Sequence, residues 1–187
     1  FNWLLPNPTS STASYYVRVV CNQDASVFDA TGSASTVIRL AATYYVNDAS
    51  TNGDKYCTAP GTSGNPGNAP DKPLPSLDEV LKRYMLSPGD TVYVDTGLYQ
   101  IYTNTVIEGS HRGSPDAPVR IVGTRGGSIL VRQPSGTNRS CLEIHADHLR
   151  IEGLTCEGSD AGISVNASSA RHVQLVANVC RNNTQSG

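Results

Sequence analysis

The feature that most constrains this chain is a short segment that occurs twice, with an offset of 24 residues. When residues 149–158 are laid over residues 173–182, two apolar positions and one cysteine coincide, namely Leu149 with Val173, Ile151 with Leu175 and Cys156 with Cys180. A shorter alternating run precedes each copy, at residues 142–145 and 163–166. Strand-length runs of side-chain period 2, separated by turn residues and repeated about every 20 to 25 residues, indicate a β-solenoid and exclude a helical repeat. We expect each unit to contain two short strands and two turns.

In a solenoid, the apolar residues of one coil stack on their counterparts in the next, about 4.8 Å away. We expect the inward residues to be the apolar positions of the alternating runs: Leu142, Ile144, Leu149 and Ile151 in one coil, and Ile163, Val165, Val173 and Leu175 in the next. A single coil buries little apolar surface. The fold therefore needs at least about three coils and a cap over each open end.

The residues before the repeat predict a cap for one end. A strand over residues 43–48 leads into a loop rich in Gly, Pro and Asn over residues 50–75, which contains Cys57. Ser76 and Glu79 then form a capping box at the start of a helix, whose apolar face carries Leu77, Val80, Leu81 and Tyr84. We expect this face to cover the first coil. Residues 43–90 are therefore assigned to the cap and residues 91–187 to roughly three to four coils, the last without a closing cap.

Residues 1–40 lie outside the repeat. Trp3, the prolines that follow it and the strand-like runs at residues 15–20 and 36–40 are typical of the last strands of a β-sandwich, which about forty residues cannot complete alone. This segment resembles the C-terminal end of the immunoglobulin-like repeats of fungal and algal cell-surface proteins. The resemblance implies that the partner of Cys21 lies upstream, and residues 41–42 are expected to be the linker to the next domain.

A second resemblance covers residues 43–187. The strand, loop and helix of the predicted cap, with the segments Pro88–Val94 and Gly97–Tyr99, resemble the N-terminal opening of right-handed parallel β-helix proteins of the pectin-lyase-like superfamily. Three later segments resemble its coils: residues 117–123, 149–155 and 173–183. The resemblance implies an all-β fold, a right-handed parallel β-helix with one N-terminal capping helix. It leaves the chemistry open, because the superfamily includes polysaccharide lyases, glycoside hydrolases, uronate epimerases and non-catalytic surface or fibre proteins.

Charge and hydropathy narrow the classes of partner. The formal net charge is −2, which argues against nucleic acid, and no apolar run is long enough to span a membrane. Residues 111–187 carry eight arginines against six acidic residues, so the repeat half is mildly basic. We expect glycans, or other copies of the same or a related chain, as partners.

Cysteines and sequons indicate the compartment. Three triplets that permit N-glycosylation begin at Asn138, Asn166 and Asn182, all at predicted turns. Together with five cysteines, they favour a secreted or cell-surface protein. Cys156 and Cys180 occupy equivalent positions on adjacent coils, and we expect them either to form a disulfide or to stack in the core.

The outward positions of the repeat carry the candidates for catalysis. A β-eliminating lyase requires a base and a cation that neutralises the substrate carboxylate. His145 and Arg150 are candidates for these roles, with Glu143 beside them on the outward face; the alternative is a solvated sheet face without catalysis. A hydrolase requires two carboxylates about 5 to 9.5 Å apart. Glu143 and Glu152 fall on different strands, and Val176 follows Glu152 on the next coil, so we expect no acidic cluster.

Other polar and aromatic residues receive structural interpretations. His145, Asp147 and His148 lie close in the sequence, but no repeat partner re-creates the group, so we expect no metal and no cofactor, with calcium as the remaining alternative. Glu157 and Arg181 are expected to form a cross-strand ion pair. Four tyrosines either stack on sugar rings or pack within the strands and the cap: Tyr44, Tyr45, Tyr93 and Tyr99.

The sequence therefore supports two functions. The first is a non-catalytic β-helix module of an extracellular or cell-surface protein, with a structural, adhesive or fibre-assembly role. The second is the N-terminal part of a polysaccharide lyase or epimerase that acts on uronic-acid polymers, which the arginine-rich coils favour. We expect the first for this segment, since no catalytic cluster is evident in its sequence.

Overall fold

The computed structural model describes residues 40–133 and 139–185, and in the N-terminal region the backbone of four short strands. The chain divides into two compact units, residues 1–40 and residues 41–187. In the first unit the strands pair antiparallel, β1 (Thr12–Tyr15) with β4 (Ser35–Ile38) and β2 (Arg18–Val20) with β3 (Phe28–Ala30). Trp3 and Cys21 lie outside the described residues, and the immunoglobulin-like assignment stays a prediction.

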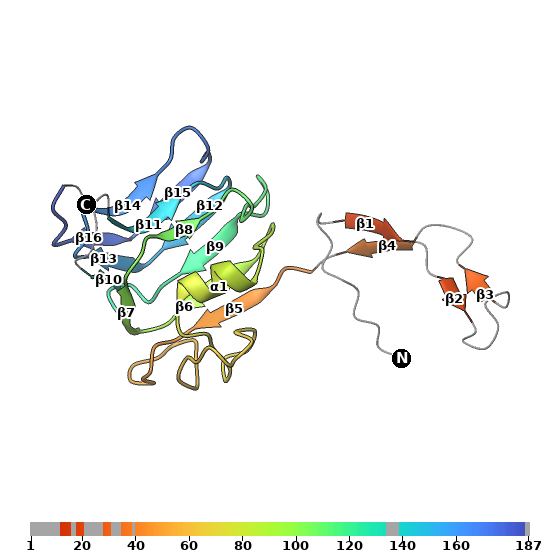
Figure 1. Cartoon of the computed structure of the whole chain (residues 1–187), viewed down its shortest axis with the longest axis horizontal. Helices are drawn as coiled ribbons and strands as arrows, with labels where there is room; N and C mark the ends of the chain where they lie inside the picture. The colour runs from red at the N-terminus through yellow and green to blue at the C-terminus, as the bar shows by residue number, and fades with distance from the viewer. Residues whose placement is uncertain are drawn as a thin grey trace. The chain divides into compact units, whose positions relative to one another are not determined.

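The strands of the second unit form three parallel sheets (Figure 1). The five-stranded sheet contains, in order, β5 (Thr43–Val46), β6 (Thr91–Val94), β9 (Val119–Val122), β12 (Leu149–Glu152) and β15 (Val173–Val176). The four-stranded sheet contains β7 (Gly97–Ile101), β10 (Ser128–Arg132), β13 (Leu154–Glu157) and β16 (Val179–Arg181). The three-stranded sheet contains β8 (Thr105–Ile107), β11 (Ser140–Ile144) and β14 (Ala161–Val165).

From β6 onward, successive strands enter these three sheets in turn, and each strand pairs in parallel with the strand three positions later in the chain. This order confirms an all-β class with stacked parallel strands. It is compatible with a β-helix-like solenoid. The repeat seen in the sequence consists of β11, β12 and β13, here called the first copy, and of β14, β15 and β16, the second copy.

The prediction of two strands per unit is wrong, because each copy contains three. The segment that was expected to be one strand, residues 149–157, is divided at Gly153 into β12 and β13. Gly153 has a φ of +74°, which turns the chain out of the five-stranded sheet. A Cβ at this position would lie 2.8 Å from the carbonyl oxygen of Gly123 in the preceding turn, so glycine also permits the close stacking. Residues 99–107, also expected to form one strand, belong to two strands, β7 and β8, which residues 102–104 separate.

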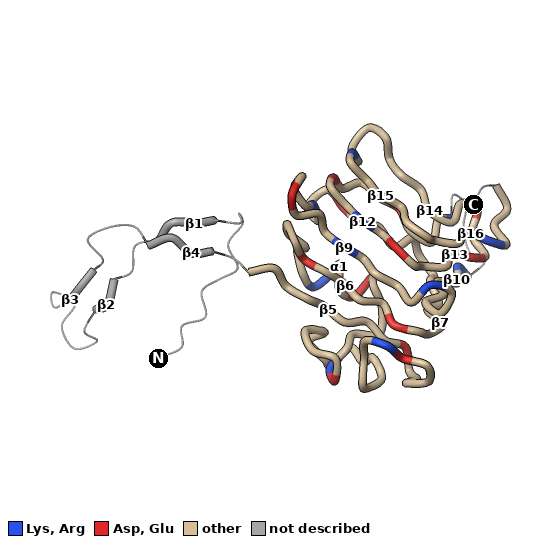
Figure 2. Tube along the Cα trace, turned by 180° about the vertical axis from the view of Figure 1, so that it is seen from behind, with Lys and Arg blue, Asp and Glu red and all other residues tan. Residues whose placement is uncertain are grey.

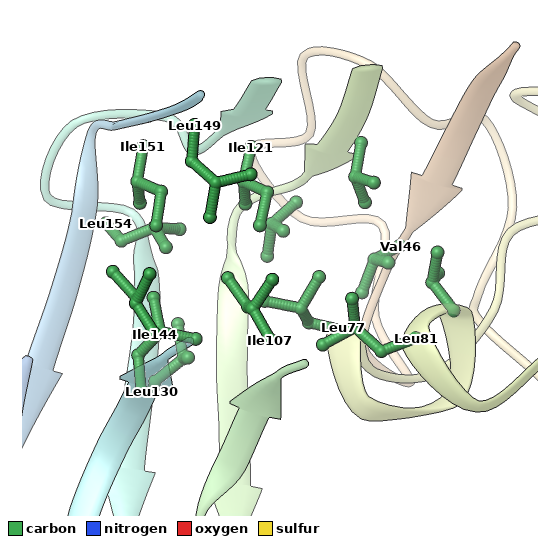
Figure 3. Close-up of a cluster of buried hydrophobic side chains, with 14 of the residues drawn as sticks. Val46, Leu77, Leu81, Ile107, Ile121, Leu130, Ile144, Leu149, Ile151 and Leu154 are labelled. Atoms are coloured by element: carbon green, nitrogen blue, oxygen red, sulfur yellow. The ribbon is translucent and has the colours of Figure 1, made fainter. Parts of the chain in front are cut away.

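The inward residues expected for the first copy are confirmed, and all four are fully buried. Figure 3 shows Ile144, Leu149 and Ile151 among the side chains of this core. In the second copy, by contrast, Val165 is 39% exposed and Leu175 is 46% exposed, while Ile163 and Val173 are half-buried. Val165 and Leu175 are the register partners of the buried residues Ile144 and Ile151, so they lie on the expected inward face but are not buried. The described strands cover the second copy on one side only, whereas the first copy is covered on both.

Helix α1 (Leu77–Arg83) lies where the sequence predicts it. The Ser76 side chain accepts a hydrogen bond from the Glu79 backbone N–H at 3.2 Å, which caps the helix N-terminus. Leu77, Val80 and Leu81 are buried, and Figure 3 shows Leu77 and Leu81 facing the interior beside Val46 and Ile107. The helix thus covers the first coil-like set of strands, as expected. Tyr84 follows the last helical residue and stacks on Tyr44, with ring centroids 4.5 Å apart.

The long loop before the helix is held by hydrogen bonds rather than by a disulfide. Asp95 is fully buried at the end of β6, and its carboxylate accepts the backbone N–H groups of Lys55, Tyr56 and Cys57 at 2.6 to 2.8 Å. Asn47, also fully buried, donates to the carbonyl groups of Ser50 and Ala59 and to Asp54. These two side chains fix the loop, and Asp95 thereby holds Tyr56 beside Tyr93 of β6 and Gly123, which follows β9.

Candidate functional site on the outer face of the five-stranded sheet

Two rows of side chains cross the outer face of the five-stranded sheet. Because the strands pair in register, each row runs perpendicular to them, with successive residues about 4.8 Å apart. One row contains Tyr45, Tyr93, Val122, Glu152 and Val176. The other contains Thr43, Thr91, Arg120, Arg150 and Gln174. The face therefore changes from aromatic near the cap to charged over β9 and β12, where Figure 2 shows basic positions on both strands.

The aromatic part of the face is a cluster of three tyrosines. The Tyr93 ring lies between Tyr45 and Tyr56, at centroid distances of 5.8 Å and 4.5 Å. Tyr56 belongs to the loop that Asp95 holds, and its hydroxyl lies 3.4 Å from the carbonyl oxygen of Gly123. Burial raises the pKa of Tyr56, so its phenol stays neutral. Partly exposed rings with a polar rim are suited to contacts with sugar rings.

The charged part of the face is a network around Glu152. Its two carboxylate oxygens bind different arginines, Arg120 at 2.7 Å and Arg150 at 3.0 Å. Arg150 also donates to the Gln174 side chain at 3.0 Å. The hydrogen bonds from Arg150 and then from Arg120 lower the pKa of Glu152, which therefore remains a carboxylate at neutral pH. A carboxylate has no proton to donate, so Glu152 cannot serve as a general acid. Together, the two arginines and Glu152 carry one net positive charge.

A depression of about 280 Å³ lies between the aromatic and the charged parts. Its lining includes the two cationic side chains Lys55 and Arg125, with Tyr56 and Glu152 and the backbone near Gly123. Lys55 and Arg125 are exposed, and neither side chain forms a hydrogen bond or ion pair within the described ranges 40–133 and 139–185. Two free cations beside an aromatic ring make this depression suitable for an anionic sugar.

His145 and Glu143 lie on a different face, that of the three-stranded sheet. The His145 Nε2 atom is 2.9 Å from Glu143 Oε1, and Asn104 donates to Glu143 Oε2 at 3.1 Å. The hydrogen bond from His145 lowers the pKa of Glu143. Glu108 lies 3.9 Å from the other ring nitrogen of His145. The structure thus brings two of the sequence candidates together.

Arg150, the third candidate, has its contacts on the five-stranded sheet. Its described partners are Glu152 and Gln174, so it shares no partner with His145. Glu143 and Glu152 likewise lie on different sheets, and Val176 follows Glu152 in register. The expected ion pair between Glu157 and Arg181 is present, with a distance of 2.7 Å. The base and the cation of a lyase are thus not placed side by side.

The structure also shows where the other predicted residues lie. Cys156 and Cys180 are in register on β13 and β16, and both are free thiols. Asn166 is half-buried, and its side-chain oxygen accepts from the backbone and hydroxyl of Ser168 in the same sequon. Asn182 is exposed, with a φ of +55°. Asn138 lies outside the described residues.

Two features were not predicted from the sequence: three loop residues that face the sheet, and a stack of two histidines. Lys55, Tyr56 and Arg125 lie in loops, where no periodic pattern signals that they face the sheet. His148 and His172 were identified as connector residues, but not their stacking, with ring centroids 4.4 Å apart; their 24-residue offset is the signal that could have predicted it. Within the part of the chain that the structure describes, no group of three His, Cys, Asp or Glu side chains is arranged to hold a metal ion.

Comparison with known proteins gives no further identification. No family model, no curated protein and no solved structure matches the chain. Among the described residues, no helix has the length and apolar character needed to cross a membrane.

Proposed function

We propose that residues 43–187 form the cap and first coils of a right-handed parallel β-helix of the pectin-lyase-like kind, in a secreted or cell-surface protein. In this proposal, the module is non-catalytic and adhesive, and the outer face of the five-stranded sheet binds an acidic glycan. The observation that carries the proposal is the continuous surface from the tyrosine cluster to Arg120 and Arg150 on the outer face of the five-stranded sheet. The cyclic order of parallel strands supports the fold, and the half-buried and exposed sequon asparagines support the compartment.

A flat parallel sheet suits an extended polysaccharide because its side chains repeat at a fixed spacing. A polymer that crosses the strands meets a side chain about every 4.8 Å. The binding free energies of several weak contacts therefore add. The tyrosine rings contact the sugar faces, and Lys55, Arg125 and Arg120 meet the carboxylates or sulfates. The surplus positive charge of residues 111–187 favours an anionic polymer over a neutral one.

The same geometry disfavours cleavage at this face. β-Elimination requires a free base beside the cation that neutralises the substrate. The carboxylate nearest to the arginines, Glu152, is already bound by two guanidinium groups. The alternative function, a lyase or epimerase, is favoured by one observation, the imidazole of His145 oriented by Glu143 on the neighbouring sheet.

Binding and cleavage are separated by one set of measurements. Isothermal titration calorimetry with polygalacturonate and alginate, and with neutral dextran as the control polymer, measures binding. Absorbance of unsaturated uronate products after long incubation measures elimination. We expect binding to the acidic polymers, no absorbance change, and about a tenfold weaker affinity in the Lys55→Ala, Arg125→Ala double variant.

Arg181→Ala is the matched control, because Arg181 is an exposed arginine on the four-stranded sheet. It should bind like the unchanged protein. Equal affinity for dextran and the acidic polymers would refute the proposed site. An absorbance signal that disappears in His145→Ala would instead establish the lyase function.

A further inference from the structure

Three cysteines meet at the junction of the two copies of the repeat. Cys156 on β13 and Cys180 on β16 are register partners, and Cys141 belongs to β11, which packs against β13. The Cys141 Sγ atom lies beside two residues adjacent to Cys156, namely its chain neighbour Glu157 and its register partner Leu130. The sequence predicted that Cys156 and Cys180 are paired, and the structure adds Cys141.

The spacing of the pair suits a disulfide. Register partners on adjacent parallel strands have Cα atoms about 4.8 Å apart and side chains on the same side of the sheet. Disulfides span Cα distances of about 4.4 to 6.8 Å. Gly162 leaves room for the sulfur, because a Cβ at this position would lie 2.6 Å from the Cys180 Sγ atom.

The three thiols differ in access to solvent. Cys141 and Cys156 are fully buried, whereas Cys180 is partly exposed. The neighbouring Cys156 thiol lowers the pKa of Cys180 to about 7, and it lowers the pKa of Cys141 to the same value, so access to solvent distinguishes these two thiols. The Cys141 sulfur lies 3.5 Å from the carbonyl oxygens of Leu130 and Glu157, inside the core. Cys180 is thus the thiol that a dissolved oxidant reaches first.

We propose that Cys141, Cys156 and Cys180 form a thiol–disulfide exchange site, in which Cys180 reacts first with a small disulfide and the bond is then passed inward. The substrate class is a low-molecular-weight disulfide, for which oxidised glutathione is the probe. This site does not depend on the glycan-binding proposal, since it lies on other strands and uses other residues.

The exchange takes place in balanced steps. The Cys180 thiolate attacks one sulfur of oxidised glutathione, forms a mixed disulfide and releases one glutathione thiolate, which takes up a proton. The neighbouring thiols and burial raise the pKa of Cys156, so its proton passes to the adjacent Cys141 thiolate as Cys156 attacks the Cys180 sulfur. This attack forms the Cys156–Cys180 disulfide and releases the second glutathione as a thiolate. Two protein thiols are oxidised and one small disulfide is reduced. Once Cys141 has lost its proton to solvent, its thiolate attacks the Cys156 sulfur, which moves the bond to Cys141–Cys156 and restores the Cys180 thiolate with no further oxidation.

The test is disulfide mapping of the whole chain after exposure to oxidised glutathione. Trypsin places the three cysteines in separate peptides, Ser140–Arg150, Ile151–Arg171 and His172–Arg181. We expect disulfide-linked pairs among these peptides. In Cys141→Ser, the Cys156–Cys180 pair should accumulate; in Cys156→Ser or Cys156→Ala, glutathione should remain on Cys180. Cys180→Ser should slow oxidation of the other two by at least about tenfold, because their thiols are buried.

Cys57→Ser is the matched control, because Cys57 is also buried and lies apart from the trio. Burial raises its pKa to about 12, so it should neither react nor alter the mapping. Circular dichroism of each variant verifies that it is folded. Glutathione that stays on Cys180 in the unchanged protein, without any linked peptides, would overturn the proposal. So would equal oxidation rates in the unchanged protein and Cys180→Ser.

Discussion

The two copies of the repeat carry the same apolar pattern but differ in what covers them. Ile151 in the first copy is fully buried, while Leu175, its register partner in the second copy, is 46% exposed. The turn residues differ as well, since Gly153 corresponds to Ala177, and both have a positive φ. The pattern thus sets the register of a strand, whereas the burial of its side chains is set by the strands on either side. Four measurements can sharpen or break this comparison.

The largest difference is expected between truncations of the two register partners. Ile151→Ala should reduce the free energy of unfolding by about 3 to 4 kcal/mol, because it leaves a cavity in a closed core. Leu175→Ala should cost about 1 kcal/mol or less, since much of its side chain already contacts solvent. Urea unfolding followed by circular dichroism measures both. Equal losses of unfolding free energy in the two variants would mean that Leu175 is covered by residues outside the described strands.

The turn of the first copy should tolerate substitution poorly. Gly153→Ala forces a Cβ into a left-handed conformation and to 2.8 Å from the Gly123 carbonyl oxygen. We expect a loss of about 2 kcal/mol, from the backbone strain and the displaced neighbouring turn. The control is Gly126→Ala, which also has a positive φ but has nothing within 4 Å of its added Cβ. Similar losses in the two variants would show that backbone strain alone, and not stacking, requires Gly153.

The charge network of the first copy predicts a pH dependence that the second copy lacks. Glu152 has a pKa below its unfolded value of about 4.3, and its register partner is Val176. The contribution of Glu152 to the free energy of unfolding is therefore present above about pH 4.3. It is lost as the pH falls through the pKa that Glu152 has in the folded protein. Glu152→Gln should lower the unfolding free energy by up to about 1 kcal/mol at pH 7 and have less effect near pH 3.

Urea unfolding at pH 7, 5 and 3 measures this dependence. Glu157→Gln is the control, because its pair with Arg181 has the more exposed arginine. A Glu152→Gln variant that destabilises equally at pH 7 and pH 3 would mean that packing, and not the ion pairs, carries the effect.

The smallest effect is expected at the turn of the second copy. Ala177 has a φ of +51°, so Ala177→Gly relieves strain, although glycine gains freedom in the unfolded chain. We expect a net stabilisation of about 0.5 kcal/mol in thermal and urea unfolding. A loss of stability would show that the alanine methyl group makes packing contacts that outweigh the strain.

Much of the fold could be predicted because it depends on local patterns. The alternation at Leu149 and Ile151 predicted an inward face, and the capping box at Ser76 and Glu79 predicted helix α1. Both depend on residues a few positions apart. The division of residues 149–157 at Gly153 was missed because a single glycine within a strand-like run does not by itself reveal a turn.

The candidate site could be predicted only in part. Arg150 and Glu152 were identified as outward residues, and the 24-residue repeat implied their neighbours in the next coil. His145 and Arg150 were paired because both were expected to be outward positions on successive strands, but those strands, β11 and β12, belong to different sheets. Lys55 and Tyr56 were missed because a buried carboxylate 39 to 40 residues away, Asp95, fixes their loop.

The sequence by itself determined the period, the register and the inward faces of the strands, because side-chain alternation and turn residues act over a few positions. Only the tertiary structure decided which charged groups meet, which cysteines touch and which apolar residues are covered. Those outcomes depend on stacking between strands that are 20 or more residues apart, as the trio of Cys141, Cys156 and Cys180 illustrates. The energy of each contact also depends on the strands stacked on both sides of it, and the sequence of a single repeat does not specify those strands.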